Sequence, residues 1–280
     1  MTATKPLLDV ENLRVSFPTP TGPVEVVKGL NLSLGRERLG IVGESGSGKS
    51  MTGRAILRLI RKPGKMTADR LAFDGVELQG LSERKMRDLR GARISMIMQD
   101  PKFSLNPVMT IGYQIAEALK AHENLSRRDV QARVIEMLQA VRINDPEQVA
   151  QMYPHQVSGG MGQRIMIAMM LIPRPDLLIA DEPTSALDVS VQGQVLDLID
   201  ELVREKGMGL ILISHDLNLV ARYCDRIMVM HAGQVVETCA AKDLHKAQHP
   251  YTRGLLAAVP QMKETREVLP VLDRSQWGGT

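Results

Sequence analysis

One stretch decides the fold: Gly43-Glu44-Ser45-Gly46-Ser47-Gly48-Lys49-Ser50. It matches the pattern G-x-x-x-x-G-K-[ST] in full, with an apolar strand-like run before it and a helix-like run, residues 51–60, after it. The glycines let backbone N–H groups curl around phosphate oxygens, and the start of the following helix adds the positive end of its dipole. The pattern therefore predicts a phosphate-binding loop.

Each part of this loop has an expected task. We expect the backbone from Gly43 through Met51 to surround the phosphates of a nucleotide. Lys49 is expected to reach the β- and γ-phosphates, and Ser50 to ligate Mg²⁺. The loop alone indicates nucleotide binding and does not distinguish kinases, GTPases and transport ATPases.

The segments around the loop predict an α/β fold. Residues 7–17 and 24–34 read as strands joined by a Pro/Gly/Thr turn, which predicts an antiparallel β layer. From residue 176 on, strand-like and helix-like segments alternate, which is typical of a parallel, doubly wound sheet. Between these parts, residues 99–156 are mainly helix-like and indicate a helical insertion.

A second motif is acidic: two acids end an apolar strand-like run, Leu177-Leu178-Ile179-Ala180-Asp181-Glu182. Asp181 is expected to hold Mg²⁺, directly or through water. Glu182 is expected to orient the attacking water or accept its proton. In-line attack on a γ-phosphate needs both tasks done by separate groups, so the two adjacent acids support nucleotide hydrolysis.

A second glycine motif, Ser158-Gly159-Gly160, precedes a helix-like run and has Ser158 in the position of an N-cap. A helix start of this kind is an anion site. One nucleotide does not need two such sites so far apart in one chain. A sandwich of two ATPase domains would use it, with each chain covering the nucleotide of the other.

These motifs, in this order, resemble those of ABC-type ATPases over about residues 7–260. The resemblance implies a P-loop NTPase core with an N-terminal antiparallel β subdomain and an inserted helical subdomain. The implied ATPase domain spans residues 1–260, with the helical subdomain at about 99–165 and a C-terminal tail at 261–280. The signature departs from the usual form because Val157, Met161 and Gly162 stand where Leu, Gln and Arg are common.

The resemblance also implies further site residues. Gln99 resembles the Q-loop glutamine, a contact to Mg²⁺ and water, and a surface amide is its alternative reading. His215 resembles the switch histidine that contacts the γ-phosphate, and Asp188 resembles the D-loop aspartate at the dimer interface. Phe17 lies where the family stacks an aromatic ring on adenine, although a strand-core Phe is an alternative.

The stretch SLNPVMTIG and the late HPYTRGLLAAVP resemble ATPases of peptide/nickel importers. That subfamily implies uptake of peptides, opines, nickel chelates or glutathione, driven by hydrolysis of Mg-ATP. It also implies two membrane permease subunits, a second and paralogous ATPase chain in a head-to-tail sandwich, and a solute-binding protein outside. The groove for the permease is expected at residues 100–109, through Phe103, Leu105 and Met109, unless these pack within the insertion. A soluble ABC-type ATPase of DNA repair or translation is the alternative.

Composition limits the remaining possibilities. The net charge of +3 is too even to favour nucleic acid as a partner. The two cysteines belong to no metal-binding cluster, and their small number fits a reducing compartment. Many ATPases of the subfamily that the chain resembles carry a cysteine cluster near the C-terminus, and this chain has none, so we predict no iron–sulfur centre. No uncharged run is long and apolar enough to span a bilayer. We therefore expect a peripheral protein at the cytoplasmic face of the cell membrane.

Overall fold

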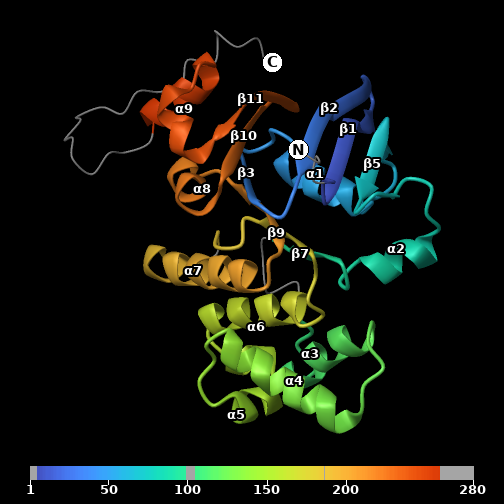
Figure 1. The fold of residues 1–280 in the computed structure, drawn as a ribbon, viewed down its shortest axis with the longest axis vertical. Helices are drawn as coiled ribbons and strands as arrows, with labels where there is room; N and C mark the ends of the chain where they lie inside the picture. The colour runs from blue at the N-terminus through green and yellow to red at the C-terminus, as the bar shows by residue number, and fades with distance from the viewer. Residues whose placement is uncertain (1–4, 99–104, 186, 259–280) are drawn as a thin grey trace. The chain divides into compact units, whose positions relative to one another are not determined.

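The structure is a computed structural model, and it describes residues 5–98, 105–185 and 187–258 (Figure 1). The chain forms two compact units. The first is built from the chain up to Gly80 and from Ile211 on, and the second is Leu81–Leu210.

An antiparallel sheet forms much of the first unit. Its strands are β1 (Leu8–Thr19), β2 (Gly22–Leu34), β4 (Lys65–Thr67), β5 (Arg70–Phe73) and β6 (Val76–Glu77). The strand order is β2-β1-β5-β6, and β4 pairs with β1. Alternate residues of β1 are buried, with a shift of register between Val10 and Leu13 where Asn12 has a φ of 51°. The antiparallel layer predicted from residues 7–34 is confirmed.

The first unit also carries a parallel strand pair and its helices. These elements are β3 (Arg38–Val42), α1 (Lys49–Ile56), α8 (Leu217–Tyr223), β10 (Arg226–His231), β11 (Gln234–Ala240), the 3-10 helix η3 (Ala241–Lys246) and α9 (Pro250–Ala258). Strand β10 pairs parallel to β3 and antiparallel to β11. Helix α8 packs closely on β3, because a Cβ atom added at Gly40 would lie 2.2 Å from a methyl carbon of Val220.

The second unit contains a helical cluster and two parallel strands. Its elements are α2 (Glu83–Leu89), β7 (Ile94–Ile97), α3 (Ile111–Lys120), α4 (Arg127–Ala140), α5 (Pro146–Gln151), the 3-10 helix η2 (Pro154–Gln156), α6 (Gly159–Leu171), β8 (Leu177–Asp181) and α7 (Val189–Glu205). Helices α3, α4, α5 and α6 pack on one another (Figure 1), and β7 pairs parallel to β8. The chain returns to the first unit within β9 (Gly209–Ser214).

One helix is shorter than its sequence predicts. The helical pattern of residues 51–60 suggested a helix to the end of that run, but α1 ends at Ile56. Arg58 adopts a left-handed φ of 53°, and the amides of Arg58 and Leu59 donate to the carbonyls of Ala55 and Arg54. This pair of hydrogen bonds is a Schellman motif, which stops a helix by satisfying its last carbonyls.

Among the described helices, none is long and apolar enough to cross a membrane.

Candidate functional site

The predicted phosphate loop follows β3 and leads directly into α1. Gly48 is the N-cap of α1 with a φ of 100°, and Gly43 has a φ of 155°. A Cβ atom added at Gly48 would lie 2.4 Å from the carbonyl oxygen of Val26. A Cβ atom added at Gly43 would lie 2.1 Å from the carbonyl oxygen of Met230. Only glycine fits at these two positions, because larger residues would meet backbone of β2 and β10.

The Lys49 side chain lies inside the loop and hydrogen-bonds its backbone. The Lys49 ammonium is buried and donates to the carbonyl oxygens of Gly43 at 2.7 Å and Glu44 at 2.8 Å. Ser45 and Gly46, at the tip of the loop, are exposed. The loop therefore presents a lysine cation from within and accessible backbone at its tip, which is the arrangement that binds polyphosphate.

The acidic strand end lies in the second unit. Every residue of β8 is buried, and its last residue, Asp181, is only 2% exposed. Glu182 follows with a φ of 46°, a left-handed conformation that is uncommon for residues other than glycine. Ser185 donates from its hydroxyl to the Glu182 carbonyl oxygen at 3.2 Å. Glu182 therefore adopts a strained backbone conformation directly after the buried strand, and such strain is typical of functional positions.

The second glycine motif begins α6, also in the second unit. Ser158 is the N-cap, as predicted, and its hydroxyl accepts a hydrogen bond from the Met161 amide at 3.3 Å. Ser158 and Gly159 are exposed, whereas Gly160 lies against α7, with an added Cβ 3.4 Å from Val191. The start of the helix is therefore accessible to a negatively charged group of another molecule.

Two glutamines that the sequence did not single out support the acidic strand end. Gln163 of α6 is 1% exposed, and its side-chain amide donates a hydrogen bond to the carbonyl oxygen of Pro183. Gln192 of α7 donates to the carbonyl oxygens of Thr184 at 3.2 Å and Leu187 at 3.1 Å. The segment after Glu182 is thus held from two helices of its own unit. No local pattern in the sequence predicts these contacts.

The remaining predicted residues lie as follows. His215 is exposed between β9 and the N-cap of α8, Asp216. Phe17 is half-buried in β1, with its ring so near Gly64 that an added Cβ there would lie 2.5 Å from it. Asp188 is exposed at the N-cap of α7. Gln99 and Phe103 lie outside the described residues.

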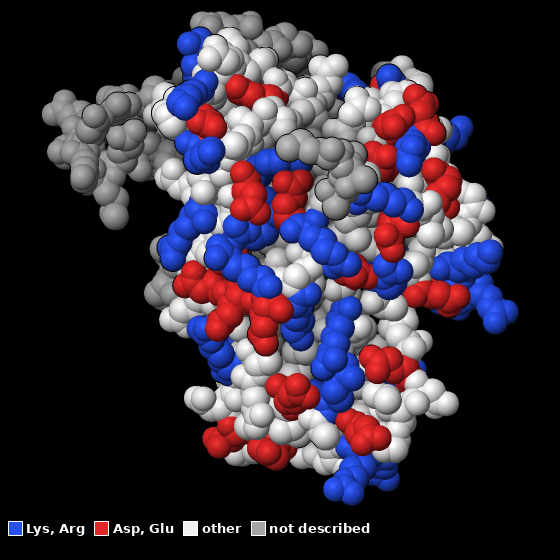
Figure 2. Space-filling view, in the orientation of Figure 1, with Lys and Arg blue, Asp and Glu red and all other residues white. Residues whose placement is uncertain are grey.

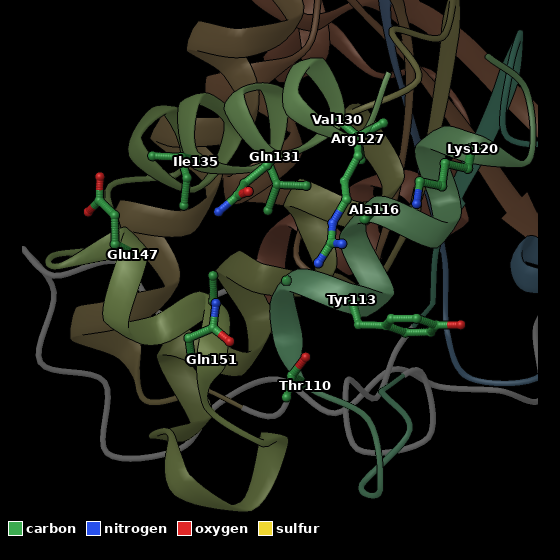
Figure 3. A pocket seen from close by; sticks show the side chains of 13 residues that line it. Thr110, Tyr113, Ala116, Lys120, Arg127, Val130, Gln131, Ile135, Glu147 and Gln151 are labelled. Atoms are coloured by element: carbon green, nitrogen blue, oxygen red, sulfur yellow. The ribbon is translucent and has the colours of Figure 1, made fainter. Parts of the chain in front are cut away.

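A pocket opens in the helical cluster, next to the segment expected to bind a membrane partner (Figure 3). Its volume is about 310 Å³, and its walls come from α3, α4 and α5. The Arg127 side chain extends from α4 toward the start of α3, and Gln151 faces it from α5 (Figure 3). Lys120 and Glu147 also line the pocket. Of the residues expected to contact the permease, Leu105 is buried and Met109 is half-buried. Val108, which the sequence did not single out, is 77% exposed.

The surface charge is mixed. Figure 2 shows Lys and Arg side chains interspersed with Asp and Glu on the face in view. The described part of the chain has no group of three His, Cys, Asp or Glu side chains arranged to hold a metal ion. Burial raises the pKa of the Cys239 thiol, and the nearby charges of Glu237 and Asp243 raise it further, so this thiol stays protonated at neutral pH.

A glycine-bounded loop between a parallel strand and a helix, with a lysine inside it, defines a P-loop nucleotide-binding protein. The comparisons with known proteins are more specific. Residues 27–185 match the family model described as "ABC transporter". The chain belongs to the ABC transporter family and is an ATPase of that family.

Curated relatives are similar over most of this chain. The dipeptide transport ATP-binding protein DppD of Escherichia coli is 48% identical over 268 residues, which are 95% of this chain and 82% of DppD. DppD of Haemophilus influenzae is also 48% identical, over 95% of this chain and 81% of its own length. The glutathione import ATP-binding protein GsiA of Escherichia coli O157:H7 is 49% identical, over 91% of this chain but 42% of GsiA.

Solved structures of ATP-binding cassettes share the fold. The dimeric cassette MJ0796 bound to ADP and Pi has a TM-score of 0.74 and 26% identity, covering 84% of this chain and 98% of that one. The cassette cbiO1 from Clostridium perfringens has a TM-score of 0.72 and 26% identity, covering 87% and 92%. The predicted fold, a P-loop ATPase of the ABC type, is confirmed.

Proposed function

We propose that this chain is the ATPase subunit of an importer that takes up peptides or related solutes through separate membrane subunits. The observation that carries the proposal is the similarity to DppD along 95% of this chain, with the phosphate loop and the acidic strand end built as described. Glutathione uptake is the related possibility that the similarity to GsiA supports. A soluble ATPase of DNA repair or translation is not favoured.

The phosphate loop, Gly43 through Met51, binds the phosphates of ATP in this proposal. Lys49, which lies inside the loop, meets the β- and γ-phosphates, and the half-buried Phe17 stacks on adenine. Glu182 takes the proton of the attacking water, and His215 hydrogen-bonds the γ-phosphate. Lys49→Ala should abolish nucleotide binding, and unchanged ATP affinity would contradict this reading.

Mg²⁺ is the metal that this site would take. Ser50 supplies a hydroxyl oxygen and Asp181 a buried carboxylate, and Mg²⁺ prefers few protein oxygens together with phosphates and water. Gln99 is proposed as a further contact to Mg²⁺ and water. When bound, the ion neutralises charge that develops on the phosphates.

A second ATPase chain completes each nucleotide site. The exposed start of α6, with Ser158, Gly159 and Gly160, meets the γ-phosphate held by the partner chain, and Asp188 lies at the interface. The dimeric cassette bound to ADP and Pi supports such an assembly. ATP favours the closed pair and ADP the open pair, so hydrolysis resets the cycle. We propose a paralogue as the partner.

The pocket between α3, α4 and α5 is proposed to receive a short segment of a permease subunit, together with the exposed Val108, which lies two positions before the pocket residue Thr110 in the sequence. Lys120, Arg127 and Glu147 at its walls provide charge for recognition, and Val108 provides apolar surface. Two permease subunits hold the pair of ATPases at the cytoplasmic face of the cell membrane, and an outside solute-binding protein delivers the solute.

Copurification from the native cell tests the proposal. We expect a tagged chain, extracted in mild detergent, to bring with it two multi-span membrane proteins and a second ATPase. The variant Arg127→Glu should reduce recovery of the membrane proteins, and Arg84→Glu, an exposed charge on α2 outside the pocket, serves as the matched control. Recovery of only soluble partners, ribosomes or DNA would overturn the transport function.

A further inference from the structure

The C-terminal segment Pro250–Ala258, helix α9, makes contact with the phosphate loop. Tyr251 is 1% exposed, and its phenol oxygen accepts a hydrogen bond from the backbone amide of Glu44 at 3.1 Å. The two residues are 207 positions apart in the chain and lie in the same unit. A buried tyrosine hydroxyl usually has a partner of this kind, but here the partner is the second residue of the loop.

Further contacts hold the Tyr251 ring and the backbone at the start of α9. Its ring lies against the ring of His231 at the end of β10, with centroids 4.2 Å apart and planes tilted by 40°. The amide of Tyr251 donates to Nδ1 of His249 at 3.2 Å. The carboxylate of Glu237 in β11 accepts from the amides of Gln248 at 2.6 Å and His249 at 3.3 Å. The start of α9 is therefore tied to the β10–β11 hairpin.

The peptide group between Gly43 and Glu44 is also constrained by β10 and by Lys49. Gly43 lies so close to the Met230 carbonyl that no Cβ would fit, and Lys49 donates to the carbonyl oxygens of Gly43 and Glu44. Tyr251 holds the amide of Glu44 on the side of α9. The first turn of the loop is thus fixed between β10 and α9, while its tip at Ser45 and Gly46 stays exposed.

We infer that Tyr251 is a positioning residue that presets the phosphate loop for the nucleotide, so that the C-terminal segment sets the affinity for ATP. A preset loop loses less conformational freedom when it binds phosphate, and this raises affinity. The HPYT stretch, residues 249–252, thereby acts on the nucleotide site. This role rests on the proposed binding of ATP at this loop.

The test is ATP binding by the full-length chain, measured with a fluorescent ATP analogue and by the rise of Tm on addition of Mg-ATP. Tyr251→Phe keeps the ring and removes the hydroxyl. We expect roughly two- to tenfold weaker nucleotide binding, the effect of one neutral hydrogen bond. In the ATPase assay the KM for ATP should rise while kcat stays unchanged, because the loss affects ground-state and transition-state binding equally.

Tyr223→Phe is the matched control, since Tyr223 is a buried tyrosine of α8 in the same unit. We expect its ATP affinity to equal that of the wild type, and the Tm without nucleotide to fall no further in Tyr251→Phe than in Tyr223→Phe. Equal ATP affinity of Tyr251→Phe and the wild type would overturn the inference. Failure of the wild type itself to bind ATP would instead overturn the proposed function.

A second variant decides the matter if Tyr251→Phe is poorly folded. Glu237→Ala removes the carboxylate that holds the start of α9 and leaves the phosphate loop and Tyr251 unaltered. ATP binding should weaken in the same direction as for Tyr251→Phe. Wild-type affinity in a folded Glu237→Ala variant would contradict a role for α9 in presetting the loop.

Discussion

The side-chain amide of Gln163 donates a hydrogen bond to the carbonyl oxygen of Pro183, and this bond joins helix α6 to the residue after Glu182. Gln163 is 1% exposed, so the bond is shielded from water. Helix α6 begins with the Ser158-Gly159-Gly160 motif. The bond therefore links, within one unit, the element that begins with the second glycine motif to the proposed catalytic acid.

Replacing Gln163 with Met should show the value of this link. The Pro183 carbonyl would stay buried without its donor, so we expect the free energy of unfolding to fall by about 1–3 kcal/mol. ATP turnover should fall as well, because Glu182 loses support. Chemical unfolding in urea measures the first effect. Gln139→Met, at an exposed position of α4, is the control, and equal stability of the two variants would argue against the link.

Glu182→Gln tests the proposed general base. The substitution keeps the size of the side chain and its left-handed backbone, and it removes the basic carboxylate. ATP binding should persist while hydrolysis falls by about 10²-fold or more. Single-turnover hydrolysis with radiolabelled ATP measures this directly. Undiminished turnover would remove Glu182 from the mechanism.

Gly162→Ala should stabilise the protein. Gly162 lies inside α6, its φ is not positive, and an added Cβ would meet no heavy atom within 4 Å. Alanine has the higher helix propensity, so the free energy of unfolding should rise by about 0.5–1 kcal/mol. Gly193→Ala in α7, where space is equally open, should act alike. A lower stability of Gly162→Ala, seen in urea unfolding, would show that this glycine has a task that the structure does not reveal.

Glu237 should make stability depend on pH. Burial raises the pKa of its carboxyl, but the Thr252 hydroxyl, the amides of Gln248 and His249, and the charge of His249 together lower it below the ordinary 4.5. The folded state then binds this proton less readily than the unfolded state. The stabilisation is complete above pH 4.5 and is lost as the pH falls through the lower pKa of the folded state.

Glu237→Gln should therefore make the free energy of unfolding depend less on pH in the acid range, the acid limb of the stability curve. Between pH 7 and pH values below the ordinary 4.5, the wild type should lose more unfolding free energy than the variant does. Glu117→Gln, which removes an exposed carboxyl on α3, should leave the limb as in the wild type. Parallel curves for the wild type and Glu237→Gln would show that the hydrogen bonds to Glu237 do not favour its ionised form.

The sequence was informative where local pattern and structure coincide. The alternation of residues 7–34 predicted the antiparallel sheet, and the motif at residues 43–50 predicted a loop between a strand and a helix, which β3 and α1 form. Phosphate binding by this loop stays a prediction. Strand β7 was missed because four buried residues after a charged helix have no period of their own. The end of α1 was misplaced because Arg58 takes a left-handed conformation that glycine usually supplies.

Contacts between distant segments were beyond the reach of these patterns. Tyr251 reaches Glu44 across 207 positions, and Gln163 reaches Pro183 across 20, so neither partner is visible from local spacing. The motifs named the residues that would contact nucleotide. The residues that hold them in place could be found only from the fold, because hydrogen bonds of this kind depend on tertiary packing.

Uptake of solute is the most direct test of the central claim, that this ATPase powers an importer. Cells that lack the native chain would receive either the wild type or Glu182→Gln, and the entry of labelled dipeptide and of labelled glutathione would be followed over time. The account predicts that at least one of these solutes accumulates with the wild type and not with the variant, although both chains are present at the membrane in equal amounts. Equal uptake of both solutes with the two chains would contradict it.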